Sequence, residues 1–302
     1  MLEMDKVTVF TPTYNRGYLL KNAYQSLKNQ TNKNFTWFIV DDGSTDQTET
    51  LVKHWMDEKH IKIKYVKQKN RGKHIAYNRV IDQVTTELFF CLDSDDCLTE
   101  DAVERILDLW HKEKNRQGIA GLIGPRGDFK DKKPKTRFPA NVQYGKMAQL
   151  YDQYHYQGET IIVFKKSVYE KYQFPELKHE KFMTESVIYD QIDSKYEMRY
   201  FDEVVYLSEY KEDGLSVQGM NLFIENPLGF AYFEKQRAGL HFQFKQRVFA
   251  ACRYFAWCEK FELYDTFGLE IKWPEKILGY LLRPLYAKKI KKYLSDYKGK
   301  RS

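Results

Sequence analysis

The sequence predicts an α/β fold with a mostly parallel sheet, helices on both faces, and a helical C-terminal region. Along residues 1–98, short apolar runs alternate with helical patterns, and this order produces parallel strands joined by crossover helices. Polar and acidic residues directly follow the apolar runs, and beyond residue 218 the patterns are helical. We therefore expect a first domain over residues 1–218, with halves at 1–98 and 99–218, and a helical region over 219–302.

The individual elements follow from the spacing of apolar residues and from turn signals. Asn15 is placed to cap the first helix, and Ser44 and Gln47 have the capping-box spacing for the next one. The basic, proline-containing segment 125–139 is expected to be a loop that acts either as a mobile lid or acceptor-binding segment or as a simple exposed connection. A second loop, over 209–216, is expected to close the first domain. Strands are expected over residues 6–10, 35–40, 61–66, 118–124, 160–164 and 200–208, and from residue 88.

Composition narrows the class of protein. The chain has 302 residues, a net charge of +7 and 16% aromatic residues, but no nucleic-acid recognition motif accompanies the charge. Nucleotides or lipid headgroups are therefore better anionic partners than nucleic acid. The four cysteines show no C-x-x-C spacing, no apolar signal segment precedes the first strand, and no apolar stretch has the length of a membrane span. We expect a cytoplasmic protein that is soluble or peripheral to a membrane.

An acidic turn follows the apolar run that begins at Leu88. Asp93 and Asp95 lie two residues apart, so an extended backbone carries both carboxylates to the same side. Carboxylates at the end of a buried strand are costly unless water or a cation compensates them. A hard divalent cation that also holds phosphate oxygens, Mn2+ or Mg2+, would do so. The alternative is a solvated turn that leads into a helix.

Other polar segments follow the remaining predicted strands. They are 11–14 after the first strand, Asp41 and Asp42 after the second, and 70–73 after the third. In a doubly wound sheet, ligands bind in the crevice beyond the carboxyl ends of the strands. We therefore expect these segments to meet the acidic turn at one edge of the sheet, where acids and cations together suit a metal-bound diphosphate.

Three motifs carry a resemblance to a known family. Thr11-Pro-Thr-Tyr-Asn15, Val40-Asp-Asp-Gly-Ser-Thr-Asp46 and Leu92-Asp-Ser-Asp-Asp96 resemble the nucleotide-binding half of family-2 inverting glycosyltransferases with the Rossmann-like A-type fold. The resemblance covers roughly the first third of the chain. It implies an inverting, metal-dependent enzyme that takes its sugar from a nucleotide-sugar donor, most simply a UDP-sugar.

The resemblance also implies roles for individual residues in donor binding. Asp41 would accept the N3 proton of uracil, Asp93 would lie near the ribose and the metal, and Asp95 would be the direct ligand of Mn2+ or Mg2+. The remaining donor-binding candidates are Thr11, Pro12 and Tyr14, as the wall of the nucleoside pocket, Ser94, and Arg71 with Lys73 for the phosphates. The alternative for Arg71 and Lys73 is a solvated basic loop.

Glu185 is the candidate general base. It stands among apolar residues, and the resemblance suggests that it removes the proton of the acceptor hydroxyl during attack on the anomeric carbon. The family usually has Glu-Asp at this point, whereas this chain has Thr184-Glu185-Ser186. The alternative is that Glu185 only occupies the first turn of a helix.

The absence of a Gln-x-x-Arg-Trp motif separates the chain from the processive synthases of the family. We expect transfer of one or a few sugars to a saccharide or lipid-linked acceptor, in the synthesis of a bacterial surface polysaccharide or glycoconjugate. Two other functions stay open. One is a sugar-nucleotide or polysaccharide-binding scaffold without activity. The other is a phosphatase of the haloacid-dehalogenase type, which needs an aspartate pair after the first strand, where this chain has Thr11-Pro12-Thr13.

The C-terminal region contains two notable helical patterns. Residues 243–263 are rich in aromatic residues and are expected to form a packed helix. Residues 277–297 form an amphipathic pattern that contains four lysines between 288 and 292. Such a helix suits peripheral contact with an anionic membrane, at the inner face of the cell membrane. The alternative is a surface helix or a contact between copies in a homo-oligomer.

Overall fold

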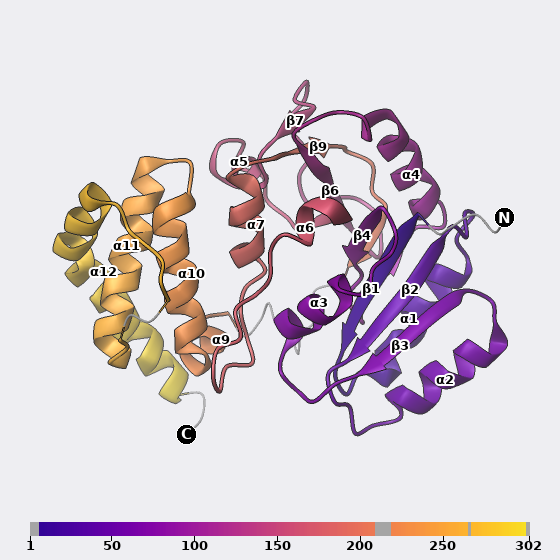
Figure 1. The fold of residues 1–302 in the computed structure, drawn as a ribbon, viewed down its shortest axis with the longest axis horizontal. Helices are drawn as coiled ribbons and strands as arrows, with labels where there is room; N and C mark the ends of the chain where they lie inside the picture. Colours follow the sequence, from indigo (N-terminus) through magenta and orange to yellow (C-terminus); the bar gives the residue numbers. More distant parts are fainter. Residues whose placement is uncertain (1–5, 209–218, 265–266, 300–302) are drawn as a thin grey trace. The chain divides into compact units, whose positions relative to one another are not determined.

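The computed structural model describes residues 6–208, 219–264 and 267–299 (Figure 1). The chain folds into two compact units, which are described separately below. The first contains residues 1–173 and 195–210, and the second contains residues 174–194 and 211–302. The predicted loop over 209–216 and the predicted domain boundary at 218 lie outside the described residues.

The first unit is built on a mixed, ten-stranded sheet with the strand order β3-β2-β1-β4-β8-β6-β10-β5, with β7 and β9 beside it. The first four strands pair in parallel, as predicted, whereas β8 is antiparallel to both β4 and β6. The strands are β1 (Val7–Thr13), β2 (Phe35–Asp41), β3 (Lys62–Lys67), β4 (Leu88–Cys91), β5 (Cys97–Leu98), β6 (Ile119–Asp128), β7 (Tyr144–Gly145), β8 (Thr160–Lys165), β9 (Glu197–Tyr200) and β10 (Tyr206–Ser208).

Helices cover both faces of this sheet because alternate residues of its central strands are apolar on each side. Val9 and Trp37 belong to a core that also contains buried residues of α1, α2 and α4, whereas Phe10 meets Tyr77 of α3 with 4.9 Å between ring centroids. The helices of the first unit are α1 (Gly17–Lys28), α2 (Thr48–Glu58), α3 (Lys73–Ile81), α4 (Ala102–Glu113), α5 (Met147–Asp152) and α6 (Lys166–Tyr169).

The helix starts near the sheet edge differ from the predicted caps. Helices α1 and α2 begin after Arg16 and Gln47, and neither has a side-chain cap at that position. The Asn15 side chain instead accepts a hydrogen bond from the backbone N–H of Thr45, so the prediction that Asn15 caps α1 was wrong. Asp46 accepts hydrogen bonds from the backbone N–H groups of Gly17 and Thr48, and one carboxylate thereby fixes the first turns of both helices.

Two predicted segments also have different structures. The segment 125–139 was expected to be a loop, but β6 continues through Arg126 to Asp128 because it pairs with β8 and then β10. The strand expected over 200–208 is two short strands, β9 and β10, on either side of a break. In both places the conformation depends on pairing with strands that are distant in the sequence. The local sequence pattern does not predict that pairing.

The second unit is helical. The prediction of a packed helix over 243–263 is confirmed by α11, whose Trp257 is fully buried against Phe230 and donates through Nε1 to the carbonyl of Pro227. Gln236 of α10 donates to the carbonyl of Val187, which ties α7 to this unit. The helices are α7 (Ser186–Asp193), α9 (Met220–Glu225), α10 (Pro227–Leu240), α11 (Phe244–Phe261) and α12 (Trp273–Gly299). Among the described residues, every helix is too short or too polar to span a bilayer.

Candidate active site

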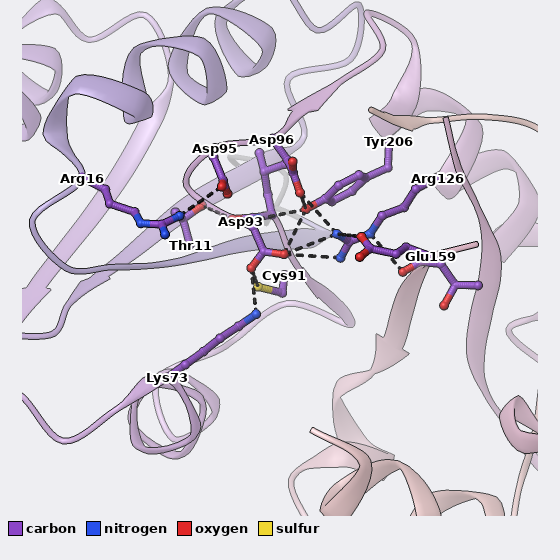
Figure 2. Close-up of polar contacts among 12 residues, drawn as sticks. Thr11, Arg16, Lys73, Cys91, Asp93, Asp95, Asp96, Arg126, Glu159 and Tyr206 are labelled. Carbon is purple, nitrogen blue, oxygen red and sulfur yellow. Dashed lines mark hydrogen bonds and ion pairs between the residues drawn. The ribbon is translucent and has the colours of Figure 1, made fainter. Parts of the chain in front are cut away.

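The acidic turn after β4 lies at the carboxyl edge of the sheet, and cations surround it (Figure 2). The Nζ of Lys73 is 2.8 Å from Oδ1 of Asp93, and Nη1 of Arg126 is 3.4 Å from its Oδ2. Burial opposes ionisation of Asp93, but the charges of Lys73 and Arg126 outweigh it and hold the pKa of Asp93 well below its usual value. Asp93 is therefore an ionised, cation-paired carboxylate rather than a solvated turn residue.

Asp96 shares Arg126 with Asp93 but has the opposite shift. Its Oδ2 lies 3.2 Å from Nη1 of Arg126 and accepts a hydrogen bond from the Tyr206 hydroxyl at 2.8 Å. Burial, and then the negative charge of Asp93, raise the pKa of Asp96 to about 7, against the opposing effects of Arg126 and Tyr206. The pKa values of Asp93 and Asp96, which are three positions apart, are thus shifted in opposite directions.

Arg126 and Tyr206 are site residues that the sequence analysis missed. The Arg126 guanidinium stacks over the Tyr206 ring at 4.1 Å and also contacts Glu159, at 3.2 Å. Tyr206 in turn accepts a hydrogen bond from the backbone N–H of Asp93. The available signal was a basic residue directly after the apolar part of a predicted strand, which places Arg126 near the edge of the sheet. No local signal marks Tyr206, because its position depends on the pairing of β10 with β5 and β6.

Asp95 pairs with Arg16, another residue that the sequence analysis did not single out. Nη1 of Arg16 lies 3.0 Å from Oδ2 of Asp95, and Figure 2 shows this pair beside the Asp93 network. The Asp95 side chain retains 16% exposure. Arg16 follows Asn15, whose backbone N–H donates to the hydroxyl of Ser44 at 2.9 Å. The acidic turn is thereby connected to the loop that follows β2.

Asp41 and Asp42 at the end of β2 have different surroundings. Asp41 is fully buried and accepts hydrogen bonds from the backbone N–H of Ser44 and from the Tyr65 hydroxyl. Burial, followed by this hydrogen bond, raises the pKa of Tyr65 well above its usual value. A chain of contacts through Ser44, Asn15 and Arg16 connects Asp41 to Asp95. Acidic residues at the ends of separate strands therefore lie at one edge of the sheet, as the doubly wound arrangement predicts.

Asp42 holds the loop before α3. Its carboxylate accepts hydrogen bonds from the Gln68 side chain and from the backbone N–H groups of Arg71 and Gly72, at 2.7 to 2.9 Å. Gly43 has a φ of 88°, and a Cβ there would come within 3.0 Å of the backbone N of Asn70, so only glycine lets the two loops approach this closely. This anchoring positions Lys73 for its contact with Asp93, and Arg71 lies beside it on an exposed part of the loop.

The remaining donor-binding candidates differ in how far their side chains are exposed to solvent. Thr11 is buried, and its hydroxyl donates to the carbonyl of Leu92 and accepts from Nε1 of Trp37, so it joins neighbouring strands. Ser94 is also buried. Pro12 is partly exposed, and Tyr14 is 47% exposed, which leaves its ring accessible at the same edge.

Glu185 belongs to the second unit, immediately before the first residue of α7. It is half-buried, and its backbone carbonyl accepts hydrogen bonds from Ile188 and Tyr189 in the first turn of the helix. Its neighbours Val187 and Ile188 are buried. Glu185 thus occupies the N-terminal end of α7.

The acidic turn suits a cation that is shared with a ligand. Among the described residues, no group of three or more His, Cys, Asp or Glu side chains could hold a metal by itself. Mg2+ and similar hard cations often bind one or two protein carboxylates together with substrate phosphates. Asp95 fits this role because it is a partly exposed carboxylate whose ion-pair partner is Arg16. Both Asp93 oxygens already face cations, so Asp93 fits it less well.

Comparison with known proteins agrees with the fold described above. Residues 8–173, more than half of the chain, match Glycosyl transferase family 2. This chain belongs to that family.

Two relatives and one solved structure show how far the similarity extends. The poly(ribitol-phosphate) beta-N-acetylglucosaminyltransferase TarP of Staphylococcus aureus is 33% identical over 171 residues, which cover 56% of this chain and 51% of TarP. The GalNAc(5)-diNAcBac-PP-undecaprenol beta-1,3-glucosyltransferase of Campylobacter jejuni is 29% identical over 180 residues, which cover 57% of this chain and 56% of that protein. The matches thus span about half the length of these relatives.

The crystal structure of S. aureus TarS 1-349 in complex with UDP-GlcNAc aligns with a TM-score of 0.60 at 16% identity, over 91% of this chain and 79% of that one. At this level of identity the alignment shows the fold. It confirms the predicted A-type glycosyltransferase architecture with C-terminal helices.

Proposed function

We propose that this chain transfers a sugar from a nucleotide-sugar donor, a UDP-sugar in the first instance, to a saccharide or lipid-linked acceptor, with inversion at the anomeric carbon. The observation that carries the proposal is that acids from two strand ends lie at the carboxyl edge of one sheet together with cations: Asp93 pairs with Lys73 and Arg126. Asp95 pairs with Arg16 there, and a chain of contacts connects it to Asp41. A cationic rim around ionised carboxylates suits a diphosphate that arrives with a divalent cation.

Donor binding is assigned to the loops after β1, β2 and β3. Asp41 would accept a hydrogen bond from the N3–H of uracil, since a buried carboxylate has further lone pairs for a donor. The accessible Tyr14 ring would cover the base, with Pro12 beside it, while Thr11 and Ser94 would shape the floor from their buried positions. Lys73 and Arg71 would contact the phosphates with charge-assisted hydrogen bonds.

The chemical step requires stabilisation of the leaving diphosphate and activation of the acceptor. Asp95, with Asp93 nearby, would hold Mn2+ or Mg2+, which when bound neutralises the negative charge that develops on the leaving group. Glu185 would accept the proton of the acceptor hydroxyl as that oxygen attacks the anomeric carbon. The names of the relatives support the substrate class, because they describe transfer of N-acetylglucosamine to poly(ribitol-phosphate) and of glucose to an undecaprenol-linked saccharide.

Synthesis of a bacterial surface polysaccharide or glycoconjugate is the setting that the names of these relatives support, and we propose that it takes place in the cytoplasm. A sugar-nucleotide-binding scaffold without activity is the alternative. A phosphatase of the haloacid-dehalogenase type is less suitable, because β1 ends at Thr13 without a carboxylate that could serve as nucleophile.

The test is a thermal-shift screen of nucleotide sugars with and without Mn2+, followed by measurement of released UDP with saccharide acceptors. A ligand that binds only the folded state raises the melting temperature. We expect stabilisation by a UDP-sugar that increases with Mn2+, and release of UDP on addition of acceptor. Stabilisation without UDP release from any donor would identify a binding scaffold. Release of inorganic phosphate without sugar transfer would identify a phosphatase.

A further inference from the structure

One face of α12 is apolar over its first turns and cationic over the next. Trp273, Leu281 and Leu285 are 74%, 67% and 65% exposed, which is unusual for large apolar side chains. Ile277, Leu278 and Tyr280 are also exposed. At 100° per residue these positions share one side of the helix, and Lys288, Lys291 and Lys292 continue the same side. We call these nine residues the α12 outer face.

The opposite side of α12 is fixed against α11, so the outer face is held in its orientation. Glu275 is 2% exposed and pairs with Arg247 of α11 at 2.7 Å. A Cβ at Gly279 would lie 2.5 Å from Cβ of Ala251, which shows how closely the two helices pack. Further along, Ile290 is buried in the core of the second unit. The buried residues of α12 recur at helical spacing on one side of the helix, so the outer face is exposed to solvent.

The helix remains continuous across Pro284, which lies between the apolar and basic parts. Proline has no N–H, so the carbonyl of Tyr280 cannot receive the usual hydrogen bond from residue 284. Arg283 supplies the missing donor, because its Nη1 lies 3.0 Å from that carbonyl oxygen. Its Nε also pairs with Glu259 at 2.8 Å, and its guanidinium stacks on the Tyr280 ring at 3.8 Å. The apolar and basic parts of the face thereby belong to one helix.

We propose that the α12 outer face binds an anionic lipid bilayer, with its apolar residues inserted at the interface and its lysines against the headgroups. This inference concerns a surface of the second unit and is independent of the proposed transfer reaction. The large apolar residues supply the insertion, and tryptophan and tyrosine are the residues that favour the boundary between headgroups and acyl chains. Lysines within a Debye length of an anionic surface add attraction.

Charge favours a bilayer over a second copy of the chain. Residues 288–292 contain four lysines and no acid. Two acidic side chains near this helix are already engaged, since Glu275 is buried with Arg247 and Glu259 pairs with Arg283. The other acid of α12, Asp296, is exposed and follows the four lysines, so lysines outnumber acids along the basic part. A second copy would therefore offer lysines to lysines along the basic part, whereas an anionic bilayer complements the whole face.

Tryptophan fluorescence gives a direct reading of insertion. The chain has five tryptophans, and Trp37, Trp55, Trp110 and Trp257 are at most 5% exposed. A blue shift on addition of vesicles would therefore come from Trp273. The full chain is mixed with vesicles of phosphatidylglycerol and phosphatidylcholine, and separately with phosphatidylcholine alone. We expect co-sedimentation and a blue shift with the anionic vesicles, with binding that weakens as salt increases.

Two variants test the two parts of the face. K288Q/K291Q/K292Q should weaken binding to anionic vesicles on the order of 100-fold. L281Q/L285Q should reduce both binding and the blue shift, and glutamine keeps the helix propensity of an exposed position. The matched control K21Q/K112Q/K114Q removes three exposed lysines from α1, α4 and the end of α4, and it should bind as the unmodified chain does. W273F should bind but lose the shift.

Several results would overturn the proposal. Equal binding to neutral and anionic vesicles would show that the lysines do not contribute to binding. An equal loss of binding in the control K21Q/K112Q/K114Q would show that only the net charge of the chain matters. If the chain does not bind vesicles and instead forms a concentration-dependent oligomer that L281Q/L285Q abolishes, the α12 outer face mediates contact between copies of the chain. Donor turnover with a water-soluble acceptor should be the same in all these variants, so failure here is distinguishable from failure of the proposed enzymatic function.

Discussion

Arg16 donates through Nη1 to the carboxylate of Asp95, with 3.0 Å between the nitrogen and Oδ2. This pair joins the start of α1 to the acidic turn after β4. A divalent cation bound to the same carboxylate would meet the positive charge of Arg16 at close range. We therefore propose that Arg16 and a divalent cation compete for Asp95 whenever the donor is absent.

Arg16→Gln should strengthen the binding of Mn2+ to the nucleotide-free protein. Removal of a partly exposed ion pair is worth up to about 1 kcal/mol, so the dissociation constant should fall roughly fivefold. Electron paramagnetic resonance of free Mn2+ measures this directly. Arg79→Gln, which removes an exposed arginine of α3, is the control and should leave the constant unchanged. An unchanged constant in Arg16→Gln would exclude competition at Asp95.

Asp95→Asn should abolish sugar transfer while preserving the fold. The amide keeps the shape but removes the charge that holds the cation, so kcat/KM should fall on the order of 100-fold or more. Steady-state kinetics and the melting temperature are the measurements. Normal turnover in this variant would remove Asp95 from the metal site.

Glu185→Gln should retain donor binding and lose transfer. A positioned base contributes on the order of 100-fold or more, and the loss should fall on kcat because the proton moves only in the chemical step. Calorimetry with the donor and steady-state rates separate the two effects. Glu197→Gln, at an exposed position of β9, is the control. A rate for Glu185→Gln equal to that of the unmodified chain places the base elsewhere.

Asp42→Ala should destabilise the first unit. The change leaves the backbone N–H groups of Arg71 and Gly72 without their buried acceptor, at a cost of about 1–3 kcal/mol. Urea unfolding gives the free energy, and Asp57→Ala, at an exposed position of α2, should change it little. If both variants unfold alike, Asp42 does not anchor the loop.

Asp96 should make stability depend on pH in the metal-free protein. Its pKa is raised from 3.8 to about 7, so the folded state holds a proton that the unfolded state releases. The stabilisation is complete below pH 3.8 and is lost as the pH rises through about 7. In the presence of EDTA, the free energy of unfolding should fall over this window, and Asp96→Asn should flatten the slope. A slope that the substitution leaves unchanged would assign it to other groups.

The sequence by itself determined the first four parallel strands and the location of the candidate site. Apolar runs such as the one in β2, ending at Asp41, specify both the strand and the point where the chain leaves the sheet. Because parallel strands share one carboxyl edge, the acids that follow β2 and β4 had to lie at that edge. The local sequence pattern, together with the rule that parallel strands share one carboxyl edge, was sufficient to predict where Asp41, Asp93 and Asp95 lie.

The tertiary structure decided which cations meet those acids. Arg126 reaches Asp93 and Asp96 because β6 pairs with β8 and β10, and Tyr206 arrives from more than a hundred residues away in the chain. The outward and inward sides of α12 were likewise set by packing: Ile290 is buried while Leu281 is exposed, although both fit one amphipathic pattern. Pairing between distant strands and close packing between helices are long-range contacts, and a local sequence pattern does not encode them.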